Sequence, residues 1–121
     1  MPSKSPLQAM HDIAENIRLA DDFLGALTLE QFAADRRTVY AVSRCLEIVS
    51  EAARRLPPEV QQRHPQLPWQ AIMSLGNVYR HEYRNVVEER TWRTVRESLP
   101  SLAEAVESEI ARIGQRSSTD G

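Results

Sequence analysis

The first apolar pattern of the chain has the spacing of one helical face. It covers residues 7–24 and predicts a helix there. Ser5 followed by Pro6 is a typical helix start, and Gly25 is a typical stop. The apolar positions on this face are Leu7, Met10, Ile13, Ile17 and Leu24.

A longer apolar pattern follows and predicts one uninterrupted helix over residues 28–56. Thr28 and Gln31 have the spacing of a capping box, and neither glycine nor proline occurs between them and Pro57. Such a helix would be roughly 40 Å long. A second apolar stripe lies beside the first, so we expect this helix to pack on its own bundle and on a second copy of the chain, as a homodimer. The first stripe is Phe32, Val39, Val42, Leu46, Val49, Ala53 and Leu56, and the second is Ala41, Ile48 and Ala52.

A proline-rich stretch separates this helix from the next. Residues 57–68 carry four prolines among polar residues, which predicts a loop with one helical turn near residues 59–63. His64 lies in this loop and is expected to be solvated. A third helix is predicted over residues 69–83, with apolar residues at Trp69, Ile72, Leu75 and Val78.

The last helical pattern contains a proline. Residues 84–89 are predicted to be a connector, and residues 89–113 a fourth helix with a clean apolar stripe. Pro100 interrupts that stripe, so we expect a kink or break there, with Ser98 able to cap the second part. Gly114 is the expected end.

Four principal helices joined by short loops predict an all-α fold, an up-down bundle. The length predicts a single domain over residues 1–121, with disordered tails at 1–5 and 115–121. No stretch alternates between apolar and polar residues over the length of a strand.

The composition is ordinary for a globular domain, with 41% hydrophobic and 26% charged residues. No apolar run reaches the roughly 18 residues of a membrane span, and the first residues lack the apolar core of a signal peptide. The single cysteine, Cys45, excludes an internal disulfide and is interpreted as a small core residue. These features indicate the cytoplasm and no membrane partner.

Net charge gives little support for nucleic-acid binding, but the placement of charge is more informative. The formal charge of −2 argues against broad, non-specific binding. Residues 80–96 contain five arginines and three glutamates, whereas residues 97–109 contain four glutamates and neither arginine nor lysine. The mildly basic part fits a local RNA-binding cleft or a merely solvated surface.

The densest group of polar and aromatic residues lies at the end of the third predicted helix. On a helix, Gly76, Arg80 and Tyr83 would share one stripe. Asn77 and His81 would share the neighbouring stripe. An imidazole moves protons near neutral pH, a guanidinium pairs with phosphate in a fixed fork, and a glycine lets another group approach the backbone. The structural alternative is that helix ends collect cations that suit the helix dipole.

Three charged residues recur at spacings of three and four on the polar side of the second helix: Arg44, Glu47 and Glu51. Most such sets are surface ion pairs worth about 0.2–0.5 kcal/mol. The other interpretation, that they border a catalytic cleft, depends on the resemblance described below.

The sequence contains none of the common metal or phosphate-binding motifs. His11 and His64 have no partners at ligand spacing, and there is no cysteine pair, no His-x3-His and no carboxylate-rich motif. A glycine-rich phosphate loop and a nucleophile elbow are also absent. We therefore expect neither a metal nor a cofactor.

Three stretches together resemble the HepT toxin family, whose members are minimal all-helical HEPN domains encoded beside a small nucleotidyltransferase antitoxin. They are CLEIVSEAARRLP at 45–57, GNVYRHEY at 76–83, and TWRTV with LPSL between 91 and 102. The resemblance extends from about residue 10 to about residue 113. It implies a metal-independent endoribonuclease that works as a homodimer, with an Arg-x4-His-x-Tyr signature in its active cleft.

His81 and Tyr83 match the histidine and tyrosine of that signature. The arginine position does not match, because Gly76 stands five residues before His81. Arg80 lies one turn further along the same helical stripe, from where its long side chain could bring a guanidinium near the expected place.

The resemblance implies RNA cleavage by transesterification through the ribose 2′-OH. His81 would act as general acid or base, and Arg80 would stabilise charge on the scissile phosphate. Asn77 and Tyr83 would position the substrate. In chains of this family the polar face of the second helix borders the cleft, so Glu47 or Glu51 would orient Arg80 or His81.

The family also implies a partner that controls the toxin. An MntA-like nucleotidyltransferase antitoxin would attach AMP to Tyr83 and so block the cleft, which makes the protein the toxin of a type II-like toxin–antitoxin pair. The alternative follows from Gly76: without the signature arginine, the chain would be a non-catalytic helical partner of a nucleotidyltransferase.

Overall fold

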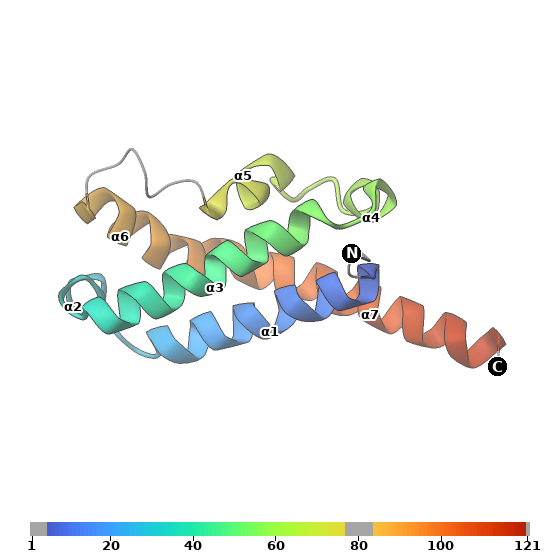
Figure 1. The fold of residues 1–121 in the computed structure, drawn as a ribbon, viewed down its shortest axis with the longest axis horizontal. Coiled ribbons are helices and arrows are strands. Elements are labelled where there is room, and N and C mark those ends of the chain that lie inside the picture. Colours follow the sequence, from blue (N-terminus) through green and yellow to red (C-terminus); the bar gives the residue numbers. More distant parts are fainter. Residues whose placement is uncertain (1–4, 77–83, 121) are drawn as a thin grey trace.

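The protein is all-helical in the computed structural model, which describes residues 5–76 and 84–120 (Figure 1). The predicted all-α bundle class is confirmed. No strand occurs in these two stretches. The elements are α1 (Pro6–Leu24), α2 (Leu29–Ala34), α3 (Arg36–Arg54), α4 (Pro58–Arg63), α5 (Trp69–Met73), α6 (Arg84–Arg93), the π-helix η2 (Thr94–Ser98) and α7 (Leu99–Asp120).

Both ends of α1 are fixed by the residues that the sequence indicated. The Ser5 hydroxyl accepts a hydrogen bond from the backbone N–H of Gln8 at 3.1 Å and caps the helix. Gly25 ends it with a φ of 54°, a backbone conformation that favours glycine. The Gly25 N–H donates to the Asp21 carbonyl at 2.8 Å.

The single helix predicted over residues 28–56 is wrong, because it is broken at Asp35 into α2 and α3. The predicted capping box of Thr28 and Gln31 is present and starts α2. The Asp35 carboxylate then accepts hydrogen bonds from the backbone N–H of Thr38 at 3.2 Å and from its hydroxyl at 2.9 Å. A short polar side chain that accepts a hydrogen bond from the backbone three residues later favours a helix start over a helix interior.

Three long helices, α1, α3 and α7, supply most of the core. Helix α1 packs lengthwise on α3 and also on α7, while α5 lies against α3 and α6 against α2 (Figure 1). Cys45 is buried, as its place in the apolar pattern predicted. The largest fully buried apolar side chains are Phe32, Met10, Ile13, Leu24, Leu99, Leu102, Val42, Val49 and Val106.

The continuous helix predicted over residues 69–83 is wrong, because α5 stops at Met73; residues 77–83 of that prediction lie outside the described part of the chain. Helix α5 stops at Met73, and Ser74 has a non-helical ψ of 1°. Two side chains of α3 bind the Met73 carbonyl: the Ser50 hydroxyl donates at 2.7 Å and Nη1 of Arg54 at 2.6 Å. These bonds satisfy a carbonyl that a continuing helix would have used, and they fix the end of α5 to α3.

The predicted connector at residues 84–89 is helical and forms the start of α6. The irregularity expected at Pro100 takes the form of the π-helix η2, in which the Leu99 N–H donates to the Thr94 carbonyl five residues earlier. Proline has no N–H to donate, and its ring collides with the carbonyl four residues before it. The π turn shifts the hydrogen-bond ladder just ahead of Pro100, so α6 and α7 follow one another without a loop. Helix α7 passes Gly114, the expected end, and runs to Asp120.

His64 is not the solvated residue that was predicted. Its side chain is 16% exposed, and its Nε2 lies 2.8 Å from Oε2 of Glu109 on α7. The Glu109 carboxylate also accepts two hydrogen bonds from Arg63, at 2.6 and 3.1 Å. The sequence could not show this contact because its partners lie 45 residues apart.

Candidate functional site

A groove runs along the polar face of α3. It has a volume of about 650 Å³. Its far wall is formed by the start of α6 and by Gly76. The residues that line it are Arg36, Val39, Tyr40, Ser43, Arg44, Glu47, Ser50, Glu51, Arg54, Gly76, Arg84, Val87 and Glu88.

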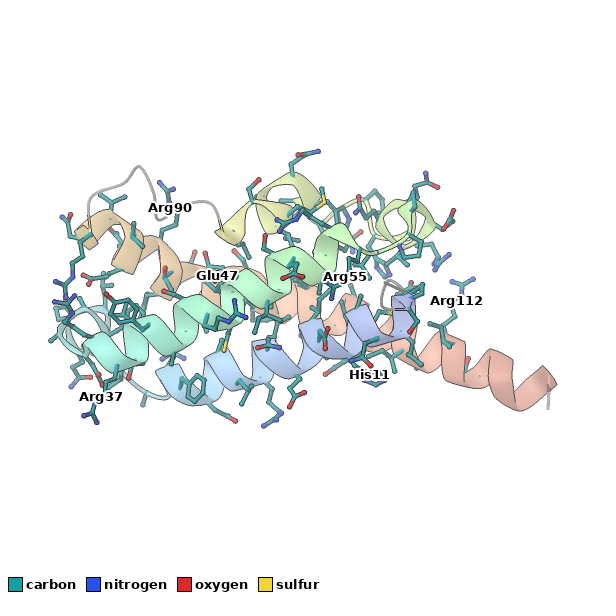
Figure 2. The ribbon with its side chains drawn as sticks, in the orientation of Figure 1. His11, Arg37, Glu47, Arg55, Arg90 and Arg112 are labelled. Carbon is teal, nitrogen blue, oxygen red and sulfur yellow. The ribbon has the colours of Figure 1, made fainter. Side chains whose placement is uncertain are left out.

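One helix provides most of this groove because its two faces differ. The nine α3 residues in the groove recur at steps of one, three and four, so they form one helical face that runs from the first turn to the last. The opposite face buries Val42, Leu46 and Val49 in the core. Glu47 lies near the middle of α3 in Figure 2. The core therefore holds α3 rigidly while its polar face remains open.

The charges of the groove are partly compensated. Nη1 of Arg44 lies 3.2 Å from a Glu47 carboxylate oxygen. Nε of Arg84 lies 2.9 Å from Glu88, whose side chain is only 8% exposed. Arg36 makes no ion pair with the carboxylates of the described residues.

Arg54 likewise has no carboxylate partner in that part of the chain, and it bonds the Ser50 hydroxyl at 2.9 Å and the Met73 carbonyl. Within the described residues, two of the four groove arginines thus have no carboxylate that compensates their charge.

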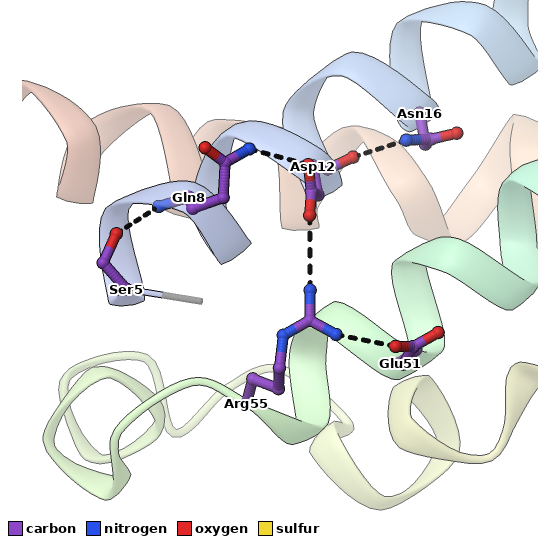
Figure 3. A network of polar contacts seen from close by, with 6 residues as sticks. All are labelled: Ser5, Gln8, Asp12, Asn16, Glu51 and Arg55. Carbon is purple, nitrogen blue, oxygen red and sulfur yellow. Dashed lines mark hydrogen bonds and ion pairs between the residues drawn. The ribbon is translucent and has the colours of Figure 1, made fainter. Parts of the chain in front are cut away.

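Glu51 also lines the groove and belongs to a network of ion pairs that joins the end of α3 to α1. Its carboxylate lies 2.9 Å from Nη1 of Arg55, and Nη2 of Arg55 lies 3.2 Å from Asp12. Figure 3 shows Arg55 between the two carboxylates. The structure therefore brings both predicted glutamates, Glu47 and Glu51, to the groove; Glu47 is paired with Arg44 of α3, and Glu51 with Arg55, the residue that follows α3.

The other predicted site residues lie outside the described part of the chain: Asn77, Arg80, His81 and Tyr83. Their two neighbours in the sequence are described. Gly76 and Arg84 precede and follow segment 77–83, and both line the groove.

The space around residue 76 does not require a glycine at this position. A Cβ at this position would lie 3.6 Å from Cα and Cγ of Glu47, which is ordinary van der Waals contact. The expectation that the missing side chain permits a close approach therefore finds no support at this position. A longer side chain placed there would begin beside Glu47 in the wall of the groove.

Sequence reasoning missed Tyr40 and Arg36, which the structure places in the groove. A signal was available, because Arg36, Tyr40 and Arg44 follow one another at steps of four and so share a helical face. The prediction of one helix through Asp35 hid this signal, because it did not mark residues 36–44 as the first turns of a separate helix.

Within residues 5–76 and 84–120, no group of three or more His, Cys, Asp or Glu side chains could hold a metal ion. No helix in the same residues is both long enough and apolar enough to cross a membrane.

The helical bundle with its arginine-bearing groove defines a small all-α domain, and comparisons with known proteins identify its family. The family model described as Ribonuclease HepT-like matches residues 13–109. This protein therefore belongs to the ribonuclease HepT-like family, which confirms the resemblance drawn from its sequence.

Individual relatives agree with this result. A probable ribonuclease HepT of Thermococcus cleftensis is 37% identical over 93 residues, which cover 77% of this chain and 84% of that protein. A protein of Methanocaldococcus jannaschii named as a candidate RNase is 32% identical over 113 residues, which cover 93% of each chain. Another candidate RNase, from Caldanaerobacter subterraneus, is 28% identical over 103 residues, or 85% of this chain and 92% of that one. No solved structure matches this chain.

Proposed function

We propose that this protein is a metal-independent endoribonuclease and the toxin of a type II-like toxin–antitoxin pair. One observation carries the proposal beyond family membership. Segment 77–83, which holds the His-x-Tyr of the family signature, is joined at both ends to residues that line the arginine-bearing groove. The segment with the His-x-Tyr residues and the groove with its arginines are thus adjacent in the chain.

The proposed reaction is transesterification. The ribose 2′-oxygen attacks the adjacent phosphorus, the bond to the 5′-oxygen of the next nucleotide breaks, and a 2′,3′-cyclic phosphate remains. One proton leaves the 2′-OH and one is added to the departing oxygen. His81 is the general base or acid in this exchange. Arg80 stabilises charge on the phosphate, and Asn77 and Tyr83 position the substrate.

Cleavage of a defined RNA in the presence of EDTA tests the assignment. Wild type is expected to cleave, and His81→Ala and Arg80→Ala are each expected to lose about 10²-fold or more in rate. Arg37→Ala is the matched arginine control, because Arg37 is exposed on α3 but does not line the groove. Full activity in a folded His81→Ala variant would show that the reaction uses another group.

Glu47 or Glu51 is proposed to orient the reacting groups, with no contact to RNA required. Each carboxylate faces the groove and holds one arginine in place. Glu47→Gln and Glu51→Gln keep the shape of the side chain and remove its charge. A positioning role predicts that one of them shifts the pH profile of cleavage, whereas a purely structural role lowers the melting temperature and leaves that profile unchanged.

The control step is proposed to be attachment of AMP to Tyr83 by an MntA-like nucleotidyltransferase antitoxin. The phenolic oxygen would attack the α-phosphorus of ATP, and pyrophosphate would leave. Intact-mass spectrometry after incubation with the neighbouring antitoxin and ATP is expected to show the added mass in wild type but not in Tyr83→Phe. A neutralised toxin of unchanged mass would contradict this step.

The active form is proposed to be a homodimer in which two copies share one cleft. Sedimentation equilibrium measures this directly: a single species of twice the chain mass is expected. A monomer that cleaves RNA at full rate would contradict the shared cleft.

A second function is favoured by one specific observation, Gly76 at the position of the signature arginine. In this case the chain is a non-catalytic helical partner that binds a nucleotidyltransferase. A folded wild-type dimer that cleaves no RNA but binds the neighbouring nucleotidyltransferase would favour this function over the nuclease.

A further inference from the structure

Tyr40 is one of two large hydrophobic side chains that are exposed in the described residues. It is 67% exposed on the first half of α3 and lines the groove. The other such residue, Phe23 on α1, lies outside the groove. An isolated exposed aromatic residue is not unusual by itself, so the surroundings of Tyr40 decide what it can do.

Cations flank the Tyr40 ring along the helix. The guanidinium carbon of Arg36 lies 6.0 Å from the ring centroid, and its Nη2 is 3.5 Å from the phenolic oxygen. Arg44 follows one turn later and is held by Glu47 at 3.2 Å. The ring is therefore exposed within a polar, cationic setting and is not part of a larger patch of exposed large hydrophobic side chains among the described residues.

We infer that Tyr40 is a stacking platform for an unpaired base of single-stranded RNA, and that Arg36 binds the phosphate beside that base. This inference rests on the proposed function and adds a substrate-positioning residue to it. Bases stack on exposed aromatic rings irrespective of sequence, and a nearby guanidinium supplies the phosphate contact. Bases of a duplex are already stacked on one another, so the site selects single strands.

The geometry separates this position from the proposed chemistry. Tyr40 is one turn from the start of α3, whereas Gly76 contacts the helix at Glu47 and Ser50, two to three turns further on. A strand held at Tyr40 would therefore enter the groove at one end and run along α3 toward Gly76. Loss of the platform should weaken substrate binding more than it slows the chemical step.

Binding of a non-cleavable probe tests the inference without requiring catalysis. The probe is a single-stranded oligoadenylate of about 12 nucleotides, blocked by 2′-O-methyl groups and carrying one 2-aminopurine. Wild type is expected to quench the 2-aminopurine fluorescence on binding. Tyr40→Ala is expected to weaken the Kd about tenfold and to abolish the quenching. Tyr40→Phe, which keeps the ring, should bind within about twofold of wild type, and Phe23→Ala is the control for loss of an exposed aromatic ring.

Arg36 is tested by comparison with its neighbour in the chain. Arg36→Ala should weaken probe binding severalfold, whereas Arg37→Ala should not. In Figure 2 Arg37 lies at the end of α3, on the side turned away from α6. Equal losses in the two variants would contradict a specific phosphate contact at Arg36.

The outcomes distinguish this inference from the proposed function. Wild type that cleaves RNA while Tyr40→Ala binds the probe equally well would overturn the stacking platform and leave the nuclease intact. Tyr40-dependent quenching in a protein that cleaves nothing would support the platform and contradict the nuclease. A Tyr40→Ala variant that turns from dimer to monomer would show an interface between copies instead, and would overturn the inference.

Discussion

At the scale of single residues, Gly76 poses the sharpest question. The family signature has an arginine at this position, and the groove wall here is formed by Glu47. Because a Cβ would be in ordinary contact with Glu47, the site accepts a Cβ without moving α3. An arginine introduced at this position would begin beside the Glu47 side chain in the wall of the groove.

Gly76→Arg in an Arg80→Ala background is predicted to recover at least about tenfold of the lost RNA cleavage, because it would supply a guanidinium from the wall of the groove. Gly76→Lys should recover less, since an ammonium lacks the planar fork that pairs with phosphate. Gly76→Ala is the control for loss of glycine alone. No recovery in a folded Gly76→Arg variant would mean that a guanidinium at this position does not reach the scissile phosphate.

Glu109 is the second residue with a measurable consequence. The hydrogen bonds from Arg63, and then those of His64, hold the pKa of Glu109 at about 2, below its ordinary value of 4.5, although burial acts in the opposite direction. A pKa that is lower in the folded state adds stability above the unfolded value, and this stability disappears as pH falls from about 4.5 to about 2.

Glu109→Gln is therefore predicted to lower the free energy of unfolding by about 1.5–3 kcal/mol at pH 7. Between pH 4.5 and 2 the variant should lose less stability than wild type, because it has no carboxylate left to protonate at this site. Urea unfolding at pH 7 and pH 3 measures both effects. Glu104→Gln, at an exposed position of the same helix, should behave like wild type; equal behaviour of the two variants would contradict the prediction.

At the scale of elements, the break between α2 and α3 depends on one side chain. Asp35 ends the short helix through its N–H and starts the long one through its carboxylate. Its hydrogen bonds to Thr38 lower the pKa of Asp35 below 3.8. The stability that the Asp35 carboxylate adds to the folded protein is therefore present at neutral pH and decreases as the pH becomes acidic.

Asp35→Ala is predicted to lower the melting temperature by a few degrees at pH 7, because α3 loses its N-cap. Asp35→Asn keeps an acceptor for the Thr38 N–H, so its melting temperature should fall much less. The difference in stability between wild type and Asp35→Ala should shrink at pH 3, because the Asp35 carboxylate of wild type becomes protonated. An Asp35→Ala variant as stable as wild type would mean that packing alone sets the start of α3.

The ends of elements could be predicted where the signal is local. Ser5 and Gly25 bound α1 as expected because a cap needs only its own neighbours. The boundaries at Asp35 and Met73 were missed for two different reasons. Asp35 resembles any polar-face residue in a helical pattern, and the end at Met73 is fixed by Ser50 and Arg54, which lie 23 and 19 residues away in sequence.

At the scale of the whole molecule, sequence reasoning found parts of the candidate site but not its surface. The spacing of Glu47 and Glu51 marked a polar helix face, the family resemblance placed that face beside a cleft, and both residues line the groove. Tyr40 and Arg36 were not identified, because membership of a groove depends on how α3 and α6 pack. The buried contact of Glu109 with residues 63 and 64 was missed because it joins helices far apart in the chain.

The partial pairing of the groove arginines fixes how RNA binding should respond to ionic strength. Arg36 and Arg54 have no carboxylate partner in the described residues, whereas Arg44 and Arg84 already have one. A strand that replaces counter-ions at two sites loses affinity with a logarithmic slope of about 1.4, or roughly 25-fold for a tenfold rise in salt. A protein of net charge −2 would thus hold its substrate through a few fixed contacts, and its affinity would depend on salt less steeply than that of a protein that binds many phosphates.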